Sequence, residues 1–567
     1  MVKNKKTNIQ SPENYDRFID DKERRNKGQF YTPKLFADYA HKMISEVLGD
    51  NWKDEYVVWD NCCGTKNLTR DYRFKELYCS TLEKEELDIS AEFNTEAVSF
   101  QFDFLNEPIA GRESLTGVYD DKLPKGLKDA LLENKPIVFL LNPPYGAPGR
   151  NDDETIKTFG GIISGACDTV INREMKSKNF GRASTNLYAQ FVYRLIMIKQ
   201  KYNLSNCYIA FFSPTLFLTG SSFYSFRNEL FNDFVFIDGI QFKASHFADV
   251  SSTWGISFSL WKTGKQIDKN NFLYKIVDVV DNDIKVIDNK LLYNTDNCIS
   301  ASYWVKPTNT KNKIEVPLLR NAITVAGEGK IDNDFIGYFL NHANNIDQST
   351  SFVTLFSTGF SGGHGVNVCK ENFEKICALF SVRKLIEKNW INSKDEYLAP
   401  NESHLKFQEF TNDSIVYSLF HISSNQSSLR QIKYHDKLWD IKNEFFWMSK
   451  SEIESLALKY NNDDCFNDAH SSSERFVYTK LQYISLSPEA RAVLDKANDI
   501  VRKTFKYRTQ FNKEHPEYQI NNWDCGFYQI KKLCKEYMPE LLKEFKEVYK
   551  ALADKMRPMV YELGFLK

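Results

Sequence analysis

The chain has 567 residues and a formal net charge of −1, with 42% hydrophobic and 26% charged residues. These values predict two or three folded domains and argue against an intrinsically disordered chain. No apolar run approaches the roughly 20 residues that span a bilayer, and the polar segment Met1–Lys6 lacks the apolar centre of a signal peptide. Eleven cysteines without a Cys-x-x-Cys pair are typical of reduced thiols. We therefore expect a cytoplasmic protein with no membrane contact and no bound metal.

Highly charged residues dominate positions 1–27, and we expect a loose arm there. Ordered structure is predicted from the segment 28–33, Gly-Gln-Phe-Tyr-Thr-Pro. Apolar residues at helical spacing follow over 35–48, with Thr32 suited to the N-cap and Pro33 to the first helical position. The sequence thus predicts an amphipathic helix at the start of the first domain.

Strands and helices alternate after this helix. Strands are expected at 56–59, 77–82, 137–141, 207–212, 235–242 and 255–261, and a further strand is expected to end near residue 102. Helices are expected at 187–198 and 222–231. This alternation predicts an α/β fold with a doubly wound sheet over about residues 28–262.

A hydrophilic stretch, 262–271, suggests a domain boundary. Weaker, mixed periodicities follow it, and strong helix formers dominate after residue 487. We expect one domain at 28–265, a mixed α+β domain at 266–486 and a helical region at 487–567.

The most informative motif is Asn142-Pro143-Pro144-Tyr145, directly after the apolar strand 137–141. The carboxyl ends of parallel strands are where open α/β sheets bind ligands. Carbonyl oxygens of this turn can accept hydrogen bonds from an exocyclic amine while the substrate ring stacks on Tyr145. The motif therefore predicts a site for a planar, amine-bearing substrate.

Four segments stand in a characteristic order: 28–33, 60–68, 102–104 and 142–145. Together they resemble the gamma class of N6-adenine DNA methyltransferases, over about residues 28–262. The resemblance implies a Rossmann-like methyltransferase sheet, S-adenosylmethionine (SAM) as cofactor, double-stranded DNA as partner, and direct methyl transfer to a flipped-out adenine. It also implies a target-recognition domain behind the catalytic half, with Lys and Arg contacting phosphates.

The same resemblance assigns roles to individual residues. It places Tyr31, Thr32 and Pro33 around the methionine end of SAM. It assigns Asp60, Cys62 and Gly64, in the loop after the first strand, to cofactor binding. It assigns the ribose hydroxyls to Glu83 and the cofactor adenine to Asp103 and Phe104. Catalysis falls to Asn142, Pro143, Pro144 and Tyr145, with the target base stacked between Tyr145 and Phe247.

Simpler interpretations stay open for several of these residues. Asp60 is equally suited to capping a turn, Glu83 to a solvated acidic patch, and Phe104 and Phe247 to the core. The adjacent thiols of Cys62 and Cys63 are interpreted as packed and unreactive.

The chain departs from the family pattern at Lys66, where a second glycine is usual. We expect an ordinary backbone conformation there, with the side chain pointing outward. The long segment 146–183 is a candidate lid that orders on DNA.

Several functions compete with DNA adenine methylation. An RNA adenine target and a catalytically impaired DNA-binding relative are the nearest alternatives. Two other functions rank lower. Enzymes that methylate a glutamine amide in proteins lack the Thr-Pro segment, and a single-chain restriction enzyme needs a nuclease signature that we do not find. A separate nuclease or regulatory partner is compatible with the sequence.

Overall fold

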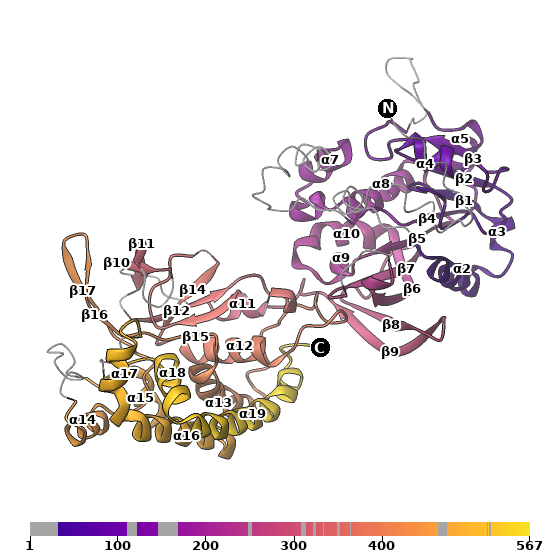
Figure 1. Ribbon diagram of the computed structural model, residues 1–567. Coiled ribbons are helices and arrows are strands. Elements are labelled where there is room, and N and C mark those ends of the chain that lie inside the picture. The colour runs from indigo at the N-terminus through magenta and orange to yellow at the C-terminus, as the bar shows by residue number, and fades with distance from the viewer. Residues whose placement is uncertain are drawn as a thin grey trace, which may run out of the picture. The chain divides into compact units, whose positions relative to one another are not determined.

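The computed structural model describes residues 32–109, 122–145, 168–247, 252–307, 313–320, 325–332, 334–348, 352–362, 364–462, 473–518, 520 and 523–567. These residues form two compact units (Figure 1). Unit 1 contains Met1–Asp296 and Asn389–Asp395, and unit 2 contains Asn297–Lys388 and Glu396–Lys567. The expected boundary at residue 265 falls inside unit 1, and a short segment from much later in the chain returns to that unit. The predicted arm, Tyr31 and residues 146–167 of the candidate lid lie outside the described residues.

Unit 1 is built on one large sheet. Its strands are β1 (Val57–Asp60), β2 (Leu77–Thr81), β3 (Val98–Gln101), β4 (Ile137–Leu141), β5 (Cys207–Ser213), β6 (Phe234–Lys243), β7 (Gly255–Thr263), β8 (Asn271–Val280) and β9 (Asp283–Tyr293). They lie in the order β3-β2-β1-β4-β5-β7-β6-β8-β9, which can be followed by the labels in Figure 1. Strands β1 to β5 run parallel, and β7 is antiparallel to both of its neighbours. The expected α/β fold with a large mixed sheet is confirmed.

The strand order reverses at β1 and β4, which pair directly. At such a switch point the loops after the two strands diverge and leave a crevice outside their carboxyl ends. Every residue of β1 and of β4 is buried, as expected for central parallel strands covered on both faces. The predicted motif at residues 142–145 therefore leaves the sheet at the point where a ligand would bind.

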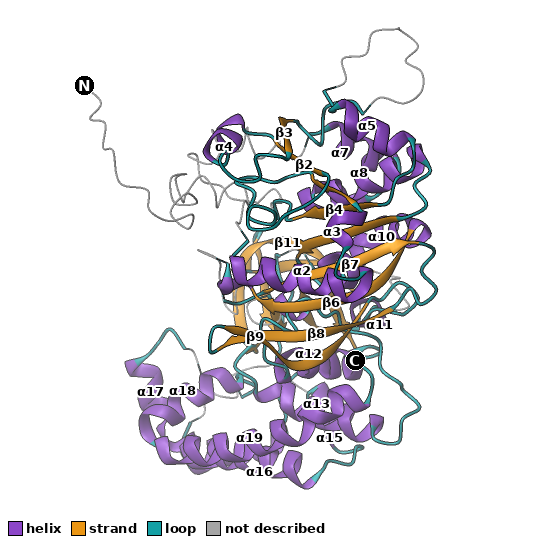
Figure 2. Ribbon diagram, turned by 90° about the vertical axis from the view of Figure 1, so that its right-hand side faces the viewer, coloured by secondary structure: helices purple, strands orange, loops and turns teal. Residues whose placement is uncertain are grey.

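Helices cover both faces of the sheet. They are α2 (Lys34–Leu48), α3 (Trp52–Glu55), α4 (Lys84–Ile89), α5 (Lys125–Leu132), α7 (Val170–Ser177), α8 (Leu187–Tyr202), α9 (Leu216–Thr219) and α10 (Tyr224–Asp233). Helices α8 and α10 lie on one side of the strands and α2 on the other (Figures 1 and 2). Helix α2 buries Phe36, Ala40 and Ile44, the apolar face that its sequence predicts.

The start of α2 differs from the prediction. Its N-cap is Pro33, in an extended conformation, and no side chain caps the helix. Thr32 is therefore not the N-cap, and its hydroxyl is used elsewhere, as described below.

Unit 2 combines small sheets with a larger set of helices. Its strands are β10 (Lys313–Leu319), β11 (Val325–Asp332), β12 (Phe335–Asn341), β13 (Val353–Phe356), β14 (Gly365–Cys369), β15 (Ser424–Asn425), β16 (Leu429–Tyr434) and β17 (Lys437–Ile441). Strands β14-β12-β13-β15 form one sheet, and β10-β11 and β16-β17 are separate pairs. Its helices are α11 (Ala301–Trp304), α12 (Phe373–Leu385), α13 (Phe407–Phe420), α14 (Lys450–Lys459), α15 (Phe476–Leu481), α16 (Pro488–Thr504), α17 (Arg508–Glu514), α18 (Phe527–Tyr537) and α19 (Pro539–Glu562).

A buried carboxylate ties the strands and helices of unit 2 together. The side chain of Asp524 is fully buried and accepts from Arg475 at 2.7 Å and from Arg430 at 3.1 Å. It also accepts from the Asn443 backbone amide at 3.0 Å. A charge removed from water in this way is tolerated because its oxygens are fully hydrogen-bonded. Within the described parts of both units, no helix has the length and hydropathy to cross a membrane.

Candidate functional site

The side-chain amide of Asn142 is fixed at both ends. Its nitrogen donates to the Thr32 hydroxyl at 2.9 Å, and its oxygen accepts from the Tyr145 hydroxyl at 2.6 Å. Because the amide cannot rotate without breaking both bonds, its carbonyl oxygen points in one direction. An amide oxygen has two lone pairs and can therefore accept more than one hydrogen bond.

Thr32 thus contributes to this site in a way that the sequence did not reveal. The hydroxyl joins two segments that are 110 residues apart and orients the amide of Asn142. Pro33 supports this arrangement, since its carbonyl accepts the first backbone bonds of α2, from Phe36 at 3.0 Å and from Ala37 at 3.1 Å. Segment 32–33 is therefore held rigidly against the turn after β4.

The loop after β1 contains buried polar groups that lack partners. Asp60 and Asn61 are each 1% exposed. Among the described residues, none makes a hydrogen bond of normal geometry to either carboxylate oxygen of Asp60 or to the amide atoms of Asn61. Burial raises the pKa of Asp60, and the Cys62 backbone amide offsets this only in part. An unsatisfied buried polar group costs about 1–3 kcal/mol, which makes these atoms candidates for hydrogen bonds to a bound ligand.

Gly64 and the two cysteines shape the same loop. Gly64 has a φ of +50°, the left-handed conformation that favours glycine. Burial raises the pKa of both the Cys62 and the Cys63 thiol, so both stay protonated at neutral pH. The Asn142 backbone amide lies close enough to lower the pKa of Cys62 in part, which places this loop beside the turn at 142–145.

Lys66 contradicts the expectation of an ordinary backbone and an outward side chain. Its φ is +61°, so it adopts the left-handed conformation that favours glycine. The side chain is buried, with Lys66 only 2% exposed, and the ammonium donates to the carbonyls of Ser90 at 3.2 Å and Phe93 at 2.9 Å. Charge-assisted hydrogen bonds to two carbonyls compensate for both the strain and the burial.

This ammonium connects two parts of the candidate cofactor site. Ser90 and Phe93 follow α4, and Glu83 is the N-cap of that helix. The Lys66 backbone meanwhile forms the loop itself, donating to Cys63 O at 2.7 Å and accepting from Arg70 N at 2.7 Å. The lysine therefore fixes the loop after β1 to the segment after β2.

Three predicted cofactor residues follow β2 and β3. Glu83 is half-buried, and its side chain makes no N-cap bond to α4. Asp103 accepts from the backbone amides of Leu105 and Asn106, each at 3.1 Å, so its carboxylate caps a turn. Phe104 is 3% exposed and stacks on Phe191 with ring centroids 5.3 Å apart. Asp103 thus caps a turn and Phe104 packs in the core, and their assignment to the cofactor adenine stays a prediction.

Phe247 lies in the core, and its predicted role in stacking the target base stays a prediction. It is fully buried, with its ring 5.8 Å from those of Phe36 and Phe212 and 5.4 Å from that of Phe242. The aromatic ring that does lie against Tyr145 is that of Trp254, with centroids 6.2 Å apart and planes at 88°. Trp254 is half-buried and precedes β7 directly. The sequence analysis missed it, because only the fold shows that the start of β7 reaches the turn after β4.

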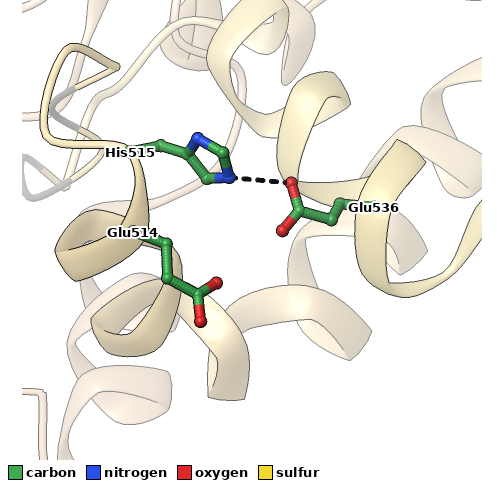
Figure 3. Close-up of side chains that lie close together, drawn as sticks. All are labelled: Glu514, His515 and Glu536. Atoms are coloured by element: carbon green, nitrogen blue, oxygen red, sulfur yellow. Dashed lines mark ion pairs between the residues drawn. The ribbon is translucent and has the colours of Figure 1, made fainter.

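Unit 2 contains a separate cluster of titratable side chains, drawn in Figure 3. In the described part of the chain, Glu514, His515 and Glu536 offer ligand atoms within 4.8 Å of one another. These groups already have partners: Glu536 lies 3.0 Å from the His515 Nε2 atom, and Glu514 accepts from Tyr537 at 2.7 Å. The cluster is accounted for as surface ion pairing and hydrogen bonding.

Comparisons with known proteins give only distant similarity. No protein-family model and no curated protein matches the chain. Among solved structures, a cryo-electron microscopy structure of a DrdV–DNA complex is 16% identical with a TM-score of 0.34, covering 59% of this chain and 37% of that one. The ATP-dependent type ISP restriction-modification enzyme LlaBIII bound to DNA is 16% identical with a TM-score of 0.29, covering 43% of this chain and 19% of that one.

A third structure is the methyltransferase subunit of a type I restriction-modification system from Streptococcus thermophilus. It is 16% identical with a TM-score of 0.28, covering 46% of this chain and 51% of that one. The chain thus spans less than two thirds of the length of each of these three proteins. Because the TM-scores are all below 0.5, the function proposed below rests on the motifs and on the geometry of the site.

Proposed function

We propose that this chain is a SAM-dependent DNA methyltransferase that methylates the N6 nitrogen of adenine. The observation that carries the proposal is the Asn142 amide, held between Thr32 and Tyr145 at the carboxyl end of β4. This turn lies beside a loop whose buried Asp60 and Asn61 lack partners among the described residues. An amine-accepting turn next to a cradle for a polar cofactor is the combination that such a transfer requires.

The residues present fit SAM. Asp60 and Asn61 supply buried polar atoms for its hydrogen-bonding groups, and Gly64 gives the backbone conformation for a close approach. Glu83, after β2, stands where an acidic side chain accepts from ribose hydroxyls in related sheets. When bound, SAM would supply an activated methyl group on a sulfonium, from which the neutral thioether is a good leaving group. The sheet is accordingly proposed to be a Rossmann-like methyltransferase sheet.

The chain's own groups then prepare the substrate nitrogen. The amino group of adenine is a weak nucleophile, because its lone pair is delocalised into the ring. The Asn142 side-chain oxygen and the Pro143 backbone carbonyl accept the two N6 hydrogens and so draw the nitrogen toward tetrahedral geometry. Tyr145 provides the stacking face, and Pro144 makes the turn rigid. The target base must leave the duplex to reach this turn, at a cost of roughly a few kcal/mol.

A DNA substrate is proposed over RNA because the motif order resembles DNA methyltransferases and a large second unit follows the catalytic one. That unit is proposed to recognise the target sequence. An RNA adenine methyltransferase and a DNA-binding relative with impaired catalysis are the alternatives. A nuclease or regulatory partner encoded separately is compatible with the proposal.

One experiment tests base, modification and sequence together. The protein is expressed in a host that lacks adenine methylation, and modified adenines are mapped by long-read sequencing. We expect N6-methyladenine at one short sequence motif, and none with Asn142→Ala. The alternatives are separated by incubating the purified protein with labelled SAM and either duplex DNA or RNA. Transfer of label to RNA alone would overturn the proposal, and so would DNA binding that is independent of SAM and without methyl transfer.

A further inference from the structure

Unit 2 has a surface groove that runs along α14 and beside the carboxyl-terminal end of α16. Its volume is about 510 Å³. Helix α14 contributes Lys459 and α16 contributes Arg502 and Lys503, while Lys506 follows directly after α16. These cationic side chains are exposed, so they reach solvent from the rim of the groove.

The groove is strongly positive although the whole chain is nearly neutral. Among the residues that line it, Glu452 is the acidic one, against four basic side chains. Glu452 lies 2.6 Å from the Arg502 Nε atom and therefore orients the guanidinium. Lys503 lies 3.5 Å from Asp499. The lining thus carries a formal charge of +3, counting four cations and one anion, in a chain whose total is −1.

The floor of the groove is apolar and aromatic. It is formed by Leu456, Tyr460 and Met538, all half-buried. The ring of Tyr460 packs on Phe505 with centroids 6.3 Å apart and planes at 27°, which fixes its orientation. A cationic rim above an apolar floor matches a sugar–phosphate backbone, in which charged phosphates alternate with less polar sugars.

We propose that this groove binds the phosphate backbone of duplex DNA. The inference rests on the proposed function and deepens it by naming residues of unit 2 that contact the nucleic acid. Lys459, Lys503 and Lys506 contact phosphates, and the Arg502–Glu452 pair sets the spacing between them. These contacts position the duplex without reading its sequence.

A purely structural role for the same side chains makes a different prediction. Lys459, Arg502 and Lys503 lie in the last turns of their helices, where cations stabilise the helix dipole by about 0.3–1 kcal/mol each. In that case their removal would lower the thermal stability of unit 2 and leave DNA affinity unchanged.

The test compares two triple variants of the full-length protein. The groove variant is Lys459→Gln/Lys503→Gln/Lys506→Gln. The control removes the same charge from exposed positions outside the groove, as Lys532→Gln/Lys543→Gln/Lys550→Gln. Affinity for a fluorescent DNA duplex is measured by anisotropy from 50 to 300 mM KCl, and methyl transfer and melting temperature are recorded in parallel. The salt range is chosen because phosphate contacts are read from the slope of log K against log [salt].

We expect the slope to fall by about three in the groove variant, roughly one for each lysine that contacts a phosphate, and to stay unchanged in the control. An unchanged slope in the groove variant overturns the inference, as does a lower melting temperature at unchanged affinity. Binding of polyglutamate but not of DNA by the wild-type protein would assign the groove to an acidic protein instead. A groove-dependent slope without methyl transfer would support the groove while refuting the proposed function.

Discussion

Replacing the buried lysine of the cofactor loop, Lys66→Met, tests how the loop after β1 is held. The substitution keeps an unbranched side chain, one atom shorter, and removes the ammonium that donates to Ser90 O and Phe93 O. A hydrogen bond from a charged donor contributes about 1.5–3 kcal/mol net, and the cost of burying the ammonium is removed at the same time. We therefore expect unit 1 to lose roughly 2–4 kcal/mol of stability, because both carbonyls lose their donor.

The assay is urea unfolding followed by tryptophan fluorescence and circular dichroism, with SAM titrated by calorimetry. Exposed Lys84→Met on α4 is the matched control and is expected to change stability by less than about 0.5 kcal/mol. If the loop is also loosened, the dissociation constant for SAM should rise about tenfold, equivalent to roughly 1.4 kcal/mol. Unfolding and SAM affinity equal to wild type would refute the view that Lys66 holds the loop.

Three further perturbations have defined outcomes. Asn142→Ala should abolish methyl transfer while SAM still binds in calorimetry; full activity would refute its role as acceptor. Burial lowers the pKa of His41 to about 3 from 6.5. The unfolded state therefore binds the proton more readily than the folded state, so the stability present above pH 6.5 should be lost as the pH falls toward 3, by up to about 1.4 kcal/mol per pH unit. In urea unfolding at pH 7, 6 and 5, His41→Gln should reduce this dependence of stability on pH. Asp524→Asn should destabilise unit 2 by about 3–5 kcal/mol, because Arg475 and Arg430 lose their buried counter-charge; an unchanged melting temperature would contradict this.

The helices and strands of unit 1 as far as β7 could largely be predicted from the sequence, because hydrophobic periodicity reports which residues are buried. The run 137–141 is fully buried as β4, and the helical face of Phe36, Ala40 and Ile44 packs as predicted. The position of residues 142–145 at a strand end followed from the same reasoning, since a short apolar strand must stop where the prolines begin.

The boundary between the two units was harder to predict from the sequence. The hydrophilic stretch near residue 265 is a turn between strands of one sheet, and β8 and β9 extend that sheet beyond it. Segment Asn389–Asp395 returns to unit 1, where the Gln241 side chain donates to Trp390 O at 3.0 Å and Lys290 pairs with Asp395 at 2.5 Å. Contacts over such separations leave no periodic signal in the chain.

The sequence by itself determined the α/β character of unit 1, the order of its strands along the chain as far as β7 and the place of the Asn-Pro-Pro-Tyr turn. Tertiary structure alone decided that Thr32 orients Asn142, that Lys66 turns inward with a left-handed backbone, and that Trp254 lies against Tyr145. The physical reason is that local patterns fix which face of an element is buried. The partner that a single polar or aromatic side chain meets depends instead on how distant elements pack.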